Sequence, residues 1–482
     1  MVEQLINRVN GLVWSPALVA LCLAAGLYFS FGTRFVQVRR FGEMARLLFS
    51  TDKTQKTGIT SFQAFAMALS GRVGTGNIVG VATAIGYGGP GAIVWMWIIA
   101  FLGAGSAFAE ATLAQVYKEN HKGEYRGGPS YYIEKGLNAK WLAVLFATCA
   151  VVACGVFLPP VQANGIAISF ANTFHIDTAW VGLGVALLIG IVVIGGVKRI
   201  ANVAQIVAPF MAILYILLSI VILIIHASEV PAVFGDMIRS AIGMNELFGG
   251  ILGSTIAWGV KRGIYSNEAG QGTAPIVAAA AKVSHPVKQG LVQAFSVYVD
   301  TLLVCTATAV MILACKTYNV FDAEGGLLYA SQAVQLGEPD VSYTTAAIST
   351  LLGVKIGGLV VSIALFFFAF TTIMAYYYYA ETNLVYLFGK GRKEHVLIWI
   401  LRILLIVAVF YGSINKASLI WSLGDIGVGT MAWINIIAIL LLSRIAFRAL
   451  RSYERQKKEG KEPEFDVDEL KIKNADFWKK NS

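Results

Sequence analysis

The stretch Ser70-Gly-Arg-Val-Gly-Thr-Gly-Asn77 interrupts a hydrophobic run, residues 61–87, that otherwise has the composition of a membrane-spanning helix. Each of its three glycines weakens a helix by about 1 kcal/mol relative to alanine. Lipid does not tolerate free backbone N–H and C=O groups unless protein or a water-filled cavity surrounds them. Because a helix that breaks at membrane depth usually marks a substrate or ion site, we predict such a site here.

A second glycine-rich interruption, Gly259-Val-Lys-Arg-Gly-Ile-Tyr-Ser-Asn-Glu-Ala-Gly-Gln-Gly272, lies in another apolar run, residues 249–281. As one straight helix this run would be about 50 Å long at 1.5 Å per residue. The hydrocarbon core of a bilayer is only about 30 Å thick, so the run must break, tilt steeply or leave the membrane. Two broken spans in corresponding halves of one chain indicate a secondary transporter.

Composition agrees with a polytopic helical membrane protein. Of 482 residues, 57% are hydrophobic and 14% are charged, and the mean hydropathy is +0.67; an average soluble domain is about 25% charged. The net charge of +10 comes from basic residues in short loops between apolar runs, so we expect no nucleic-acid partner. All five cysteines fall in apolar segments, which argues against a disulfide framework, a zinc site or another cofactor.

A span needs about 20 apolar residues. By that measure the sequence predicts eleven spans: 12–31, 61–87, 90–116, 140–158, 178–196, 200–227, 249–281, 286–315, 355–388, 395–414 and 418–443. Basic residues gather in alternate loops, above all in 32–60 and 118–140. The positive-inside rule therefore predicts a multi-pass protein of the cell membrane whose amino terminus is outside and whose carboxyl terminus is cytoplasmic.

The predicted spans divide into two groups of five. Residues 1–60 hold an extra first span and a cytoplasmic amphipathic segment, 61–228 the first group, and 229–443 the second. Each group begins with a glycine-broken run, one entering from the cytoplasm and the other from outside, so we expect an inverted repeat. Residues 444–482 form a basic cytoplasmic tail, expected to be mobile beyond a short helix near lipid headgroups.

Several motifs resemble the alanine or glycine:cation symporter family across nearly the whole chain. They are Val73-Gly-Thr-Gly-Asn77 with Ile78–Ala84, Lys261–Gly270, Gln162–Phe170 and Phe368-Ala-Phe-Thr-Thr372. The resemblance implies an all-α, LeuT-type inverted 5+5 repeat with one extra amino-terminal span. It also implies sodium-coupled uptake of small neutral amino acids, alanine or glycine.

A zwitterionic substrate requires donors for its carboxylate and acceptors for its ammonium group. Backbone N–H groups at a half-helix amino terminus suit a carboxylate. Thr75 and Gly76 can offer such groups at the first break, and so can the start of the second half of the seventh span, near Ser266 and Asn267. Sodium, a hard cation, prefers oxygen ligands, which carbonyls of an unwound segment and paired hydroxyls supply.

The resemblance to LeuT-type carriers implies where the sodium binds. It places one ion between the carbonyls of Ser70 and Val73 and the hydroxyls of Thr371 and Thr372, with the carbonyl of Phe368 as a further ligand. Asn77 lies where that fold's other sodium site takes a side-chain oxygen. For the substrate pocket, the same resemblance and the two breaks point to a wall made by Gln162, Asn164, Phe170, Trp258, Gln271, Thr372 and Tyr376.

The chain departs from the family pattern at four positions. It has Gly270-Gln-Gly-Thr273 where members commonly read Gly-Met-Gly-Ser, Ala375 where they have a small Gly, and Tyr376 where they often have Trp. These differences make an amide substrate such as glutamine conceivable as an alternative.

Each feature also has a purely structural explanation. Gly76 and Gly80 form a GxxxG packing motif, and the Thr371-Thr372 hydroxyls could bond back to a preceding helical carbonyl. Three basic side chains, Arg72, Lys261 and Arg262, should be paired or face water, since buried charges cost about 2.5–3.5 kcal/mol on insertion scales. The available acids serve either as gates or, as we prefer, as ion-pair partners that fix the broken helices: Glu110, Glu268, Asp300, Glu381 and Asp425.

Other functions fit the sequence less well. All five histidines lie at or beyond span ends, which excludes a midplane histidine relay and favours sodium over protons, although Asp or Glu could still carry a proton. A channel would need a continuous polar pore, which two asymmetric breaks in one chain do not suggest. The sequence has no HExxH, GxSxG or paired-aspartate motif, so we do not expect an enzyme.

Overall fold

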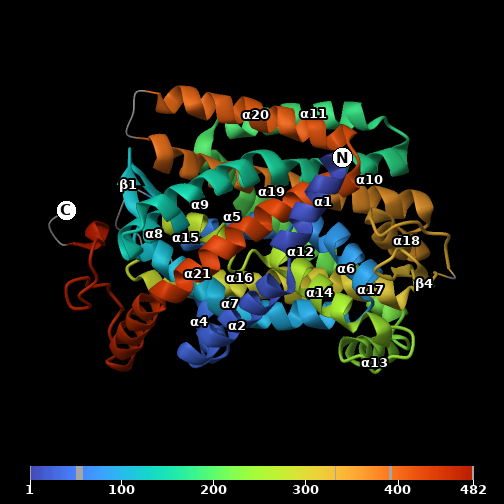
Figure 1. Ribbon diagram of the computed structural model, residues 1–482, viewed down its shortest axis with the longest axis horizontal. Coiled ribbons are helices and arrows are strands. Elements are labelled where there is room, and N and C mark those ends of the chain that lie inside the picture. Colours follow the sequence, from blue (N-terminus) through green and yellow to red (C-terminus); the bar gives the residue numbers. More distant parts are fainter. Residues whose placement is uncertain (1, 50–57, 332, 390–392, 480–482) are drawn as a thin grey trace.

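The computed structural model describes residues 2–49, 58–331, 333–389 and 393–479, and most of its helices run along one long axis (Figure 1). The carboxyl-terminal segment lies at one end with β1 (Glu119–His121) and α8 (Pro129–Leu137). The opposite end holds α13 (Val230–Ala241), α18 (Val341–Leu352) and β4 (Leu327–Tyr329). Within the described residues, the all-helical prediction is modified by two antiparallel hairpins, β1 with β2 (Glu124–Arg126) and β3 (Val320–Phe321) with β4, and by an isolated parallel bridge between Ile59 and Ala281.

Eight helical segments of the described chain are long and apolar enough to cross a membrane. They are Glu3–Gly32, Ala92–Val116 (α7), Lys140–Phe174, Gly196–Ile225 (α12), Pro286–Ala314, Val354–Phe388 (α19), Glu394–Ile414 (α20) and Ala417–Lys458 (α21). Three of the eleven predicted spans do not form a continuous helix that is long and apolar enough to be among these eight. Two of them, 61–87 and 249–281, are broken, and the third forms the 16-residue helix α11 (Thr178–Val193).

Two further segments are longer than predicted or internally irregular. Residues Glu3–Gly32 hold α1 (Val2–Val13) and α2 (Pro16–Gly32), so helix begins well before the predicted start at 12. The fourth span, predicted as 140–158, continues past Pro159 and Pro160: α9 (Lys140–Val152), a π-helical turn η2 (Ala153–Phe157) and α10 (Leu158–Phe174) follow without a gap. The irregular turn precedes the prolines, which cannot donate to the helical ladder.

The first break is narrow. Helix α5 (Ser61–Arg72) starts at a capping box, in which Thr60 and Gln63 satisfy each other's backbone N–H groups. Helix α5 ends at Arg72, and Val73 and Gly74 are not helical. The helix then resumes as a π-helical turn η1 (Gly76–Gly80) followed by α6 (Val81–Gly88).

The second break is wider and lies later than the motif suggested. Helix α14 (Leu252–Asn267) runs through the first half of the glycine-rich motif, and Glu268 ends it in the left-handed conformation, at φ 57°. Gly270 and Gly272 also have positive φ, 81° and 89°, which glycine adopts without strain. The second half-helix, α15 (Ala274–Ala280), begins only after them.

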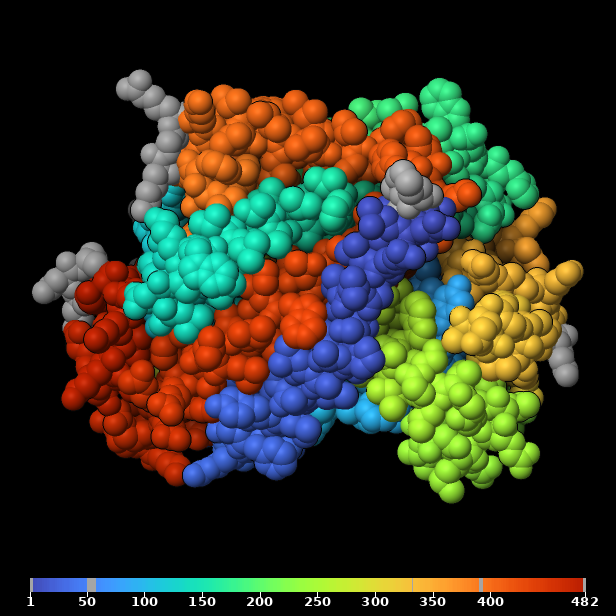
Figure 2. All heavy atoms as spheres, viewed as in Figure 1, coloured from blue at the N-terminus to red at the C-terminus, as the bar shows by residue number. Residues whose placement is uncertain are grey.

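The remaining elements complete the bundle around the two breaks. They are α3 (Val36–Arg39), α4 (Phe41–Leu48), η3 (Gly249–Ile251), α16 (Pro286–Val297), the π-helical η4 (Tyr298–Cys305), α17 (Thr306–Ala314) and η5 (Asp476–Trp478). The amino-terminal helices lie diagonally along α21 (Figure 2), where Trp14 Nε1 donates to the carbonyl of Asp425 at 2.8 Å.

The prediction of a mobile tail is wrong for residues up to 479. Helix α21 continues through the expected boundary at 443 to Lys458, and the following segment folds back onto the bundle. Phe465 N donates to the carbonyl of Ser284 at 3.0 Å, and Trp478 Nε1 donates to that of Gln115 at 2.9 Å. The Lys118 ammonium lies 4.6 Å from the ring centre of Phe477, and its burial lowers its pKa well below the usual value. Aromatic side chains, among them Phe465, Phe477 and Trp478, thus anchor this segment.

Candidate functional site

Backbone and hydroxyl oxygens converge beside the first break. The hydroxyl of Thr372, on α19, lies 2.8 Å from the carbonyl oxygen of Ser70 and 3.2 Å from that of Val73. The Phe368 carbonyl oxygen is 2.9 Å from the same hydroxyl. Because α5 ends at Arg72, the carbonyls near its end lack a full set of helical partners and can turn toward α19. This oxygen cluster brings together four of the predicted sodium ligands.

Thr371 behaves differently from its neighbour. Its hydroxyl donates to the carbonyls of Phe367 and Phe368, both at 3.0 Å and both in its own helix. Bonding back to the preceding turn was the structural explanation for both threonines. This explanation accounts for both hydrogen bonds of the Thr371 hydroxyl. The Thr372 hydroxyl, in contrast, also bonds to the carbonyl of Ser70 on α5.

Gln162 connects α10 to the first break. Its Oε1 accepts a hydrogen bond from the backbone N–H of Thr75 at 2.9 Å. This amide oxygen occupies one of the N–H groups that we predicted to bind a substrate carboxylate. Gly74 makes the approach possible, because a Cβ at this position would lie 2.6 Å from Gln162 Oε1 and 2.5 Å from Thr372 Oγ1.

Asn77 links the two breaks through a buried carboxylate. Its Oδ1 accepts from the N–H of Gly74 at 2.8 Å, and its Nδ2 donates to Asp300 Oδ1 at 2.7 Å. The hydroxyl of Ser266, near the end of α14, donates to Asp300 Oδ2 at 2.9 Å, and that of Thr301 does so at 2.8 Å. Side-chain oxygens of Asn77, Ser266 and Asp300 are thus close together, although 34 and 223 residues separate Asp300 from the other two.

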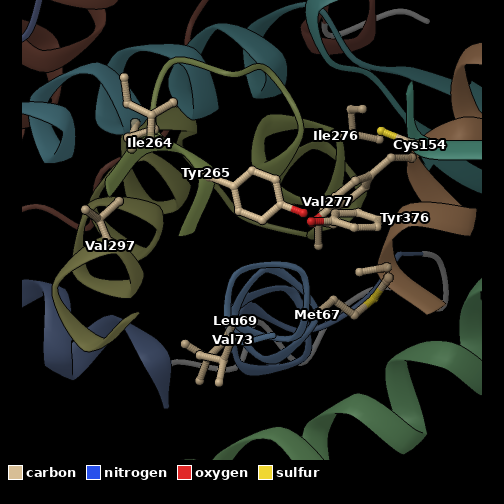
Figure 3. Close-up of a cluster of buried hydrophobic side chains, with 14 of the residues drawn as sticks. Met67, Leu69, Val73, Cys154, Ile264, Tyr265, Ile276, Val277, Val297 and Tyr376 are labelled. Carbon is tan, nitrogen blue, oxygen red and sulfur yellow. The ribbon is translucent and has the colours of Figure 1, made fainter. Parts of the chain in front are cut away.

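Unpartnered polar atoms gather around the breaks. Tyr376, one helical turn after Thr372, is buried, and its hydroxyl and that of Tyr265 point toward each other above α5 (Figure 3). Gln271 is also buried, in the second break. Several buried atoms here have no hydrogen-bond partner among the residues that the structure describes: Ser70 Oγ, Thr75 Oγ1, Tyr265 Oη, Asn267 Nδ2, Gln271 Nε2 and Oε1, and Thr273 Oγ1. Since buried polar groups are normally satisfied, this cluster suits a polar ligand.

The three buried basic residues differ in their partners. Lys261 Nζ lies 2.6 Å from Asp425 Oδ2, and Arg262 forms a bidentate pair with Asp425 at 2.9 and 3.1 Å. Arg72 forms no ion pair within the described part of the chain; its guanidinium donates to the carbonyls of Asn267 (2.6 Å) and Gln293 (3.3 Å). The prediction that all three are paired or face water therefore fails for Arg72.

A cavity of about 450 Å³ adjoins the Asp425 ion pairs, on the side toward α18 and the loop before it. Trp258 lines it and stacks on Tyr87, with ring centres 4.9 Å apart. Arg262 lines the same cavity and also lies 5.6 Å from the ring centre of Tyr265. Lys261, Arg262 and Asp425 therefore line this cavity, and Arg262 also reaches the Tyr265 ring beside the breaks.

Some predicted site residues do not join the cluster. Phe170 packs on Phe174 and Phe366, with ring centres 5.4 and 6.3 Å away, and it is eight residues, or about 12 Å along the helix, from Gln162. Asn164 lines the 450 Å³ cavity and donates to the carbonyls of Gly412 and Asn415. The assignment of Ser266 and Asn267 to the start of a half-helix is wrong, because α14 ends there.

Sequence reasoning missed the specific roles of Asp300 and Tyr265. An acid inside an apolar run is a signal in itself, because such residues are costly in membranes and usually functional. Nothing in the sequence indicated that Asp300 faces Asn77. Tyr265 lies within the quoted motif but carries no feature that separates it from a packing aromatic.

Two membrane-depth breaks that face each other, with oxygen ligands and unpartnered polar atoms between them, define a membrane transporter. A solved structure of a manganese transporter from Eremococcus coleocola has a similar fold, at 12% identity and a TM-score of 0.50 over 89% of this chain and 95% of that one. The chain belongs to the sodium:alanine symporter family, whose model matches residues 1–467. This confirms the family predicted from the motifs, and a transporter rather than an enzyme.

Two relatives from Bacillus subtilis cover almost the full length. One, named a putative sodium/proton-dependent alanine carrier protein, is 55% identical over 98% of this chain and 97% of its own. Another, named a probable sodium/glutamine symporter, is 41% identical over 98% of this chain and 95% of its own.

Proposed function

We propose that this protein is a sodium-coupled symporter that carries alanine, and glycine as a smaller analogue, into the cell by alternating access. The observation that supports this most strongly is the oxygen cluster around Thr372. Ser70, Val73 and Phe368 each direct a carbonyl oxygen to within 3.2 Å of its hydroxyl. Several neutral oxygens converging on one point of a broken helix suit a monovalent hard cation, and Thr371 would complete the set by turning its hydroxyl away from its own helix.

The substrate would bind between the two breaks. Its carboxylate would replace Gln162 Oε1 at the N–H of Thr75 and also reach the N–H of Gly76. Its ammonium group would find acceptors among the unpartnered oxygens, of which Gln271 Oε1 and Tyr265 Oη are buried and nearby. Tyr376 would limit the size of the side chain. Trp258 would lie on the entry route through the 450 Å³ cavity, with Asn164 in its wall.

The proposed architecture is the LeuT-type inverted repeat of five plus five helices. The break between α5 and α6 and the break between α14 and α15 begin the two repeats. The amino terminus would lie outside, so the cavity beside Trp258 would open outside and the carboxyl-terminal segment would lie in the cytoplasm. Asn77 and Asp300 would then be available for a second cation, since Asn77 Nδ2 donates directly to Asp300 Oδ1 at 2.7 Å and keeps the two side chains together.

Proton coupling is the alternative that a specific observation favours. Glu110, Glu268 and Asp300 are fully buried and take part in no ion pair within the described part of the chain. The name of the 55% identical relative includes both ions. Alanine is preferred to glutamine as substrate, because the relative named for glutamine is the less similar of the two.

Uptake by purified protein in proteoliposomes tests the proposal. We expect radiolabelled alanine to accumulate when an inward sodium gradient is imposed, with glycine competing and chloride having no effect. Replacement of sodium by choline should abolish accumulation. Undiminished alanine uptake in choline with a proton gradient present would refute sodium as the coupling ion. Accumulation of glutamine but not of alanine would refute alanine as the substrate.

A further inference from the structure

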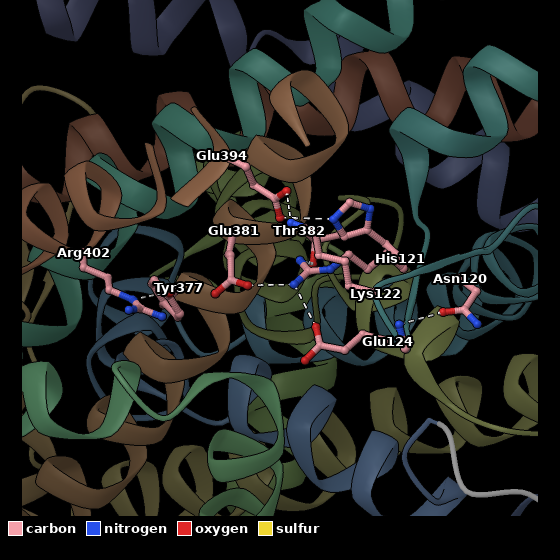
Figure 4. Close-up of polar contacts among 11 residues, drawn as sticks. Asn120, His121, Lys122, Glu124, Tyr377, Glu381, Thr382, Glu394 and Arg402 are labelled. Carbon is pink, nitrogen blue, oxygen red and sulfur yellow. Dashed lines mark hydrogen bonds and ion pairs between the residues drawn. The ribbon is translucent and has the colours of Figure 1, made fainter. Parts of the chain in front are cut away.

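The buried acids of the bundle fall into two kinds. Asp425 pairs with Lys261 and Arg262. Glu381, which is labelled in Figure 4, pairs with Arg126 at 2.8 Å. These two acids are the ion-pair partners that the sequence led us to expect. The other three acids named from the sequence, Glu110, Glu268 and Asp300, are completely buried and take part in no ion pair within the described residues. These three carboxyl groups must therefore be stabilised by something other than an ion pair, either by hydrogen bonds or by a bound proton.

Hydrogen bonding separates Glu268 from the other two. Asp300 accepts from Asn77, Ser266 and Thr301. Glu110 accepts from the N–H of Gly270 at 3.2 Å and from Asn435 Nδ2 at 2.8 Å. Both therefore have the donors that stabilise a buried anion.

Glu268 has far fewer donors. The hydroxyl of Tyr379 donates to its Oε2 at 3.3 Å. Its Oε1 accepts no hydrogen bond of ordinary geometry among the described residues, and the further donor beside it, the hydroxyl of Thr273, is neutral. One long bond from a neutral group does not offset the desolvation of a carboxylate.

The charges that face Glu268 do not neutralise it. Its titratable neighbours come from four elements: Arg72 on α5, Cys154 on η2, Asp300 on η4, and Tyr376 and Tyr379 on α19. Glu110, on α7, reaches the same break through the N–H of Gly270. Arg72 is the single basic residue of this set, and its guanidinium is bonded to the carbonyls of Asn267 and Gln293 instead. Arg72 must also serve Asp300 and Glu110, so one cation faces three acids. Burying unpaired charge is more costly than binding a proton.

The position of Glu268 ties it to both broken helices. It ends α14 with φ at 57°, the left-handed conformation that commonly caps the carboxyl end of a helix. On α5, a Cβ at Gly71 would overlap the Tyr379 hydroxyl and lie 3.2 Å from Glu268 Oε1. The carboxyl group therefore fills the space that Gly71 leaves, and any relative movement of the two half-helices changes its surroundings.

We propose that Glu268 is a proton-binding site, carrying a proton on Oε1 while the breaks are closed. The proton is taken up from water on the face to which the site is open and returned to water on the other face, so no other co-reactant is needed. Only the role of this proton in transport rests on the proposed function; its presence on Glu268 does not.

Infrared spectroscopy of the full-length protein tests the proposal directly. We expect Glu268→Gln to remove the carbonyl band of one protonated carboxylic acid from the wild-type spectrum at neutral pH. The matched control is Glu381→Gln, which should leave that band intact and remove carboxylate absorption, because Glu381 is ion-paired. An unchanged carbonyl band together with a loss of carboxylate absorption in Glu268→Gln would overturn the proposal.

A second variant keeps the test decisive if Glu268→Gln does not fold. Tyr379→Phe removes the hydroxyl that donates to Oε2 without changing any charge. The carbonyl band of a protonated Glu268 should then move to higher frequency, whereas no shift would contradict a proton at this site.

Transport measurements then separate the two proposals. Wild-type alanine uptake driven by a pH gradient should vary with pH by up to about tenfold per unit, the limit for one proton. Glu268→Gln should vary by less than about twofold while sodium-driven uptake persists. Absent alanine uptake in the wild type would refute the proposed function and leave the spectroscopic result standing. A pH dependence that Glu268→Gln retains in full would place the coupling proton elsewhere and refute this inference.

Discussion

Replacement of Gly74 by alanine tests the oxygen cluster most directly. Gly74 does not have positive φ, so alanine can adopt its backbone conformation and the effect must come from the added methyl group. That Cβ would lie 2.5 Å from Thr372 Oγ1 and 2.6 Å from Gln162 Oε1. An ordinary contact begins near 3.4 Å, so the Thr372 hydroxyl must retreat by about 0.9 Å, the difference between 3.4 and 2.5.

The retreat has a calculable consequence. It would take Thr372 Oγ1 beyond bonding distance of the carbonyls of Ser70 and Val73, now 2.8 and 3.2 Å away. An interaction with a charged group contributes about 1.5–3 kcal/mol. Since about 1.4 kcal/mol corresponds to a factor of ten, the sodium concentration for half-maximal uptake should rise about 10- to 100-fold.

The assay is initial alanine uptake in proteoliposomes as a function of sodium concentration, with thermal unfolding to check that the variant folds. Gly80→Ala is the matched control, because its Cβ would meet nothing closer than Arg262 Cδ at 3.8 Å. It should shift the sodium dependence by less than about twofold. Equal sodium dependence for Gly74→Ala, Gly80→Ala and the wild type would refute the reasoning.

Three further predictions follow from the same geometry. Thr372→Ala should raise the sodium requirement about tenfold or more, and Thr371→Ala should raise it less, because in this structure Thr371 bonds only within α19; the reverse order in sodium titrations would contradict the assigned ligands. Gly76→Val should abolish alanine binding, measured by calorimetry, while the protein still inserts into the membrane. The added Cβ would lie 3.3 Å from the Cα of Ser266, and a β-branched side chain has too few rotamers to avoid this contact. Retained affinity for alanine would exclude this segment from the substrate site. Asp425→Asn leaves Lys261 and Arg262 buried without a carboxylate and should lower the free energy of unfolding by about 3–5 kcal/mol; an unchanged melting temperature would show that the ion pairs contribute no stability.

Local physics explains which features could be predicted from the sequence. Glycine weakens a helix wherever it occurs, and apolar length determines whether a segment can span a membrane, so both breaks and most spans could be located without the fold. The motifs around Gly74, Glu268 and Thr372 placed the chain in its family for the same reason: they are short and contiguous. The sequence predicted that the breaks exist more accurately than where they lie. The second break, for example, starts after Asn267 rather than before it.

Partnerships between distant residues could not be predicted in this way. Thr372 meets Ser70 across 302 residues, and Arg262 meets Asp425 across 163. Such contacts depend on how each helix is rotated and packed against its neighbours, which a helical pattern alone leaves undetermined when nearly all of its faces are apolar. That is why the packing of Phe170 on Phe174 and Phe366 could not be foreseen, and why Arg72, expected to be paired or to face water, is buried with no ion pair among the described residues.

The amino-acid sequence thus determined that this chain is a helical membrane transporter with two interrupted helices, because composition and backbone propensity act residue by residue. The tertiary structure decided which polar groups those interruptions bring together. It also decided that Asp425 and Glu381 are paired while Glu268 is not, and that the tail packs against the bundle. The physical reason is that the charge state and hydrogen bonding of a buried group depend on the few atoms around it, and those atoms come from helices far apart in the chain.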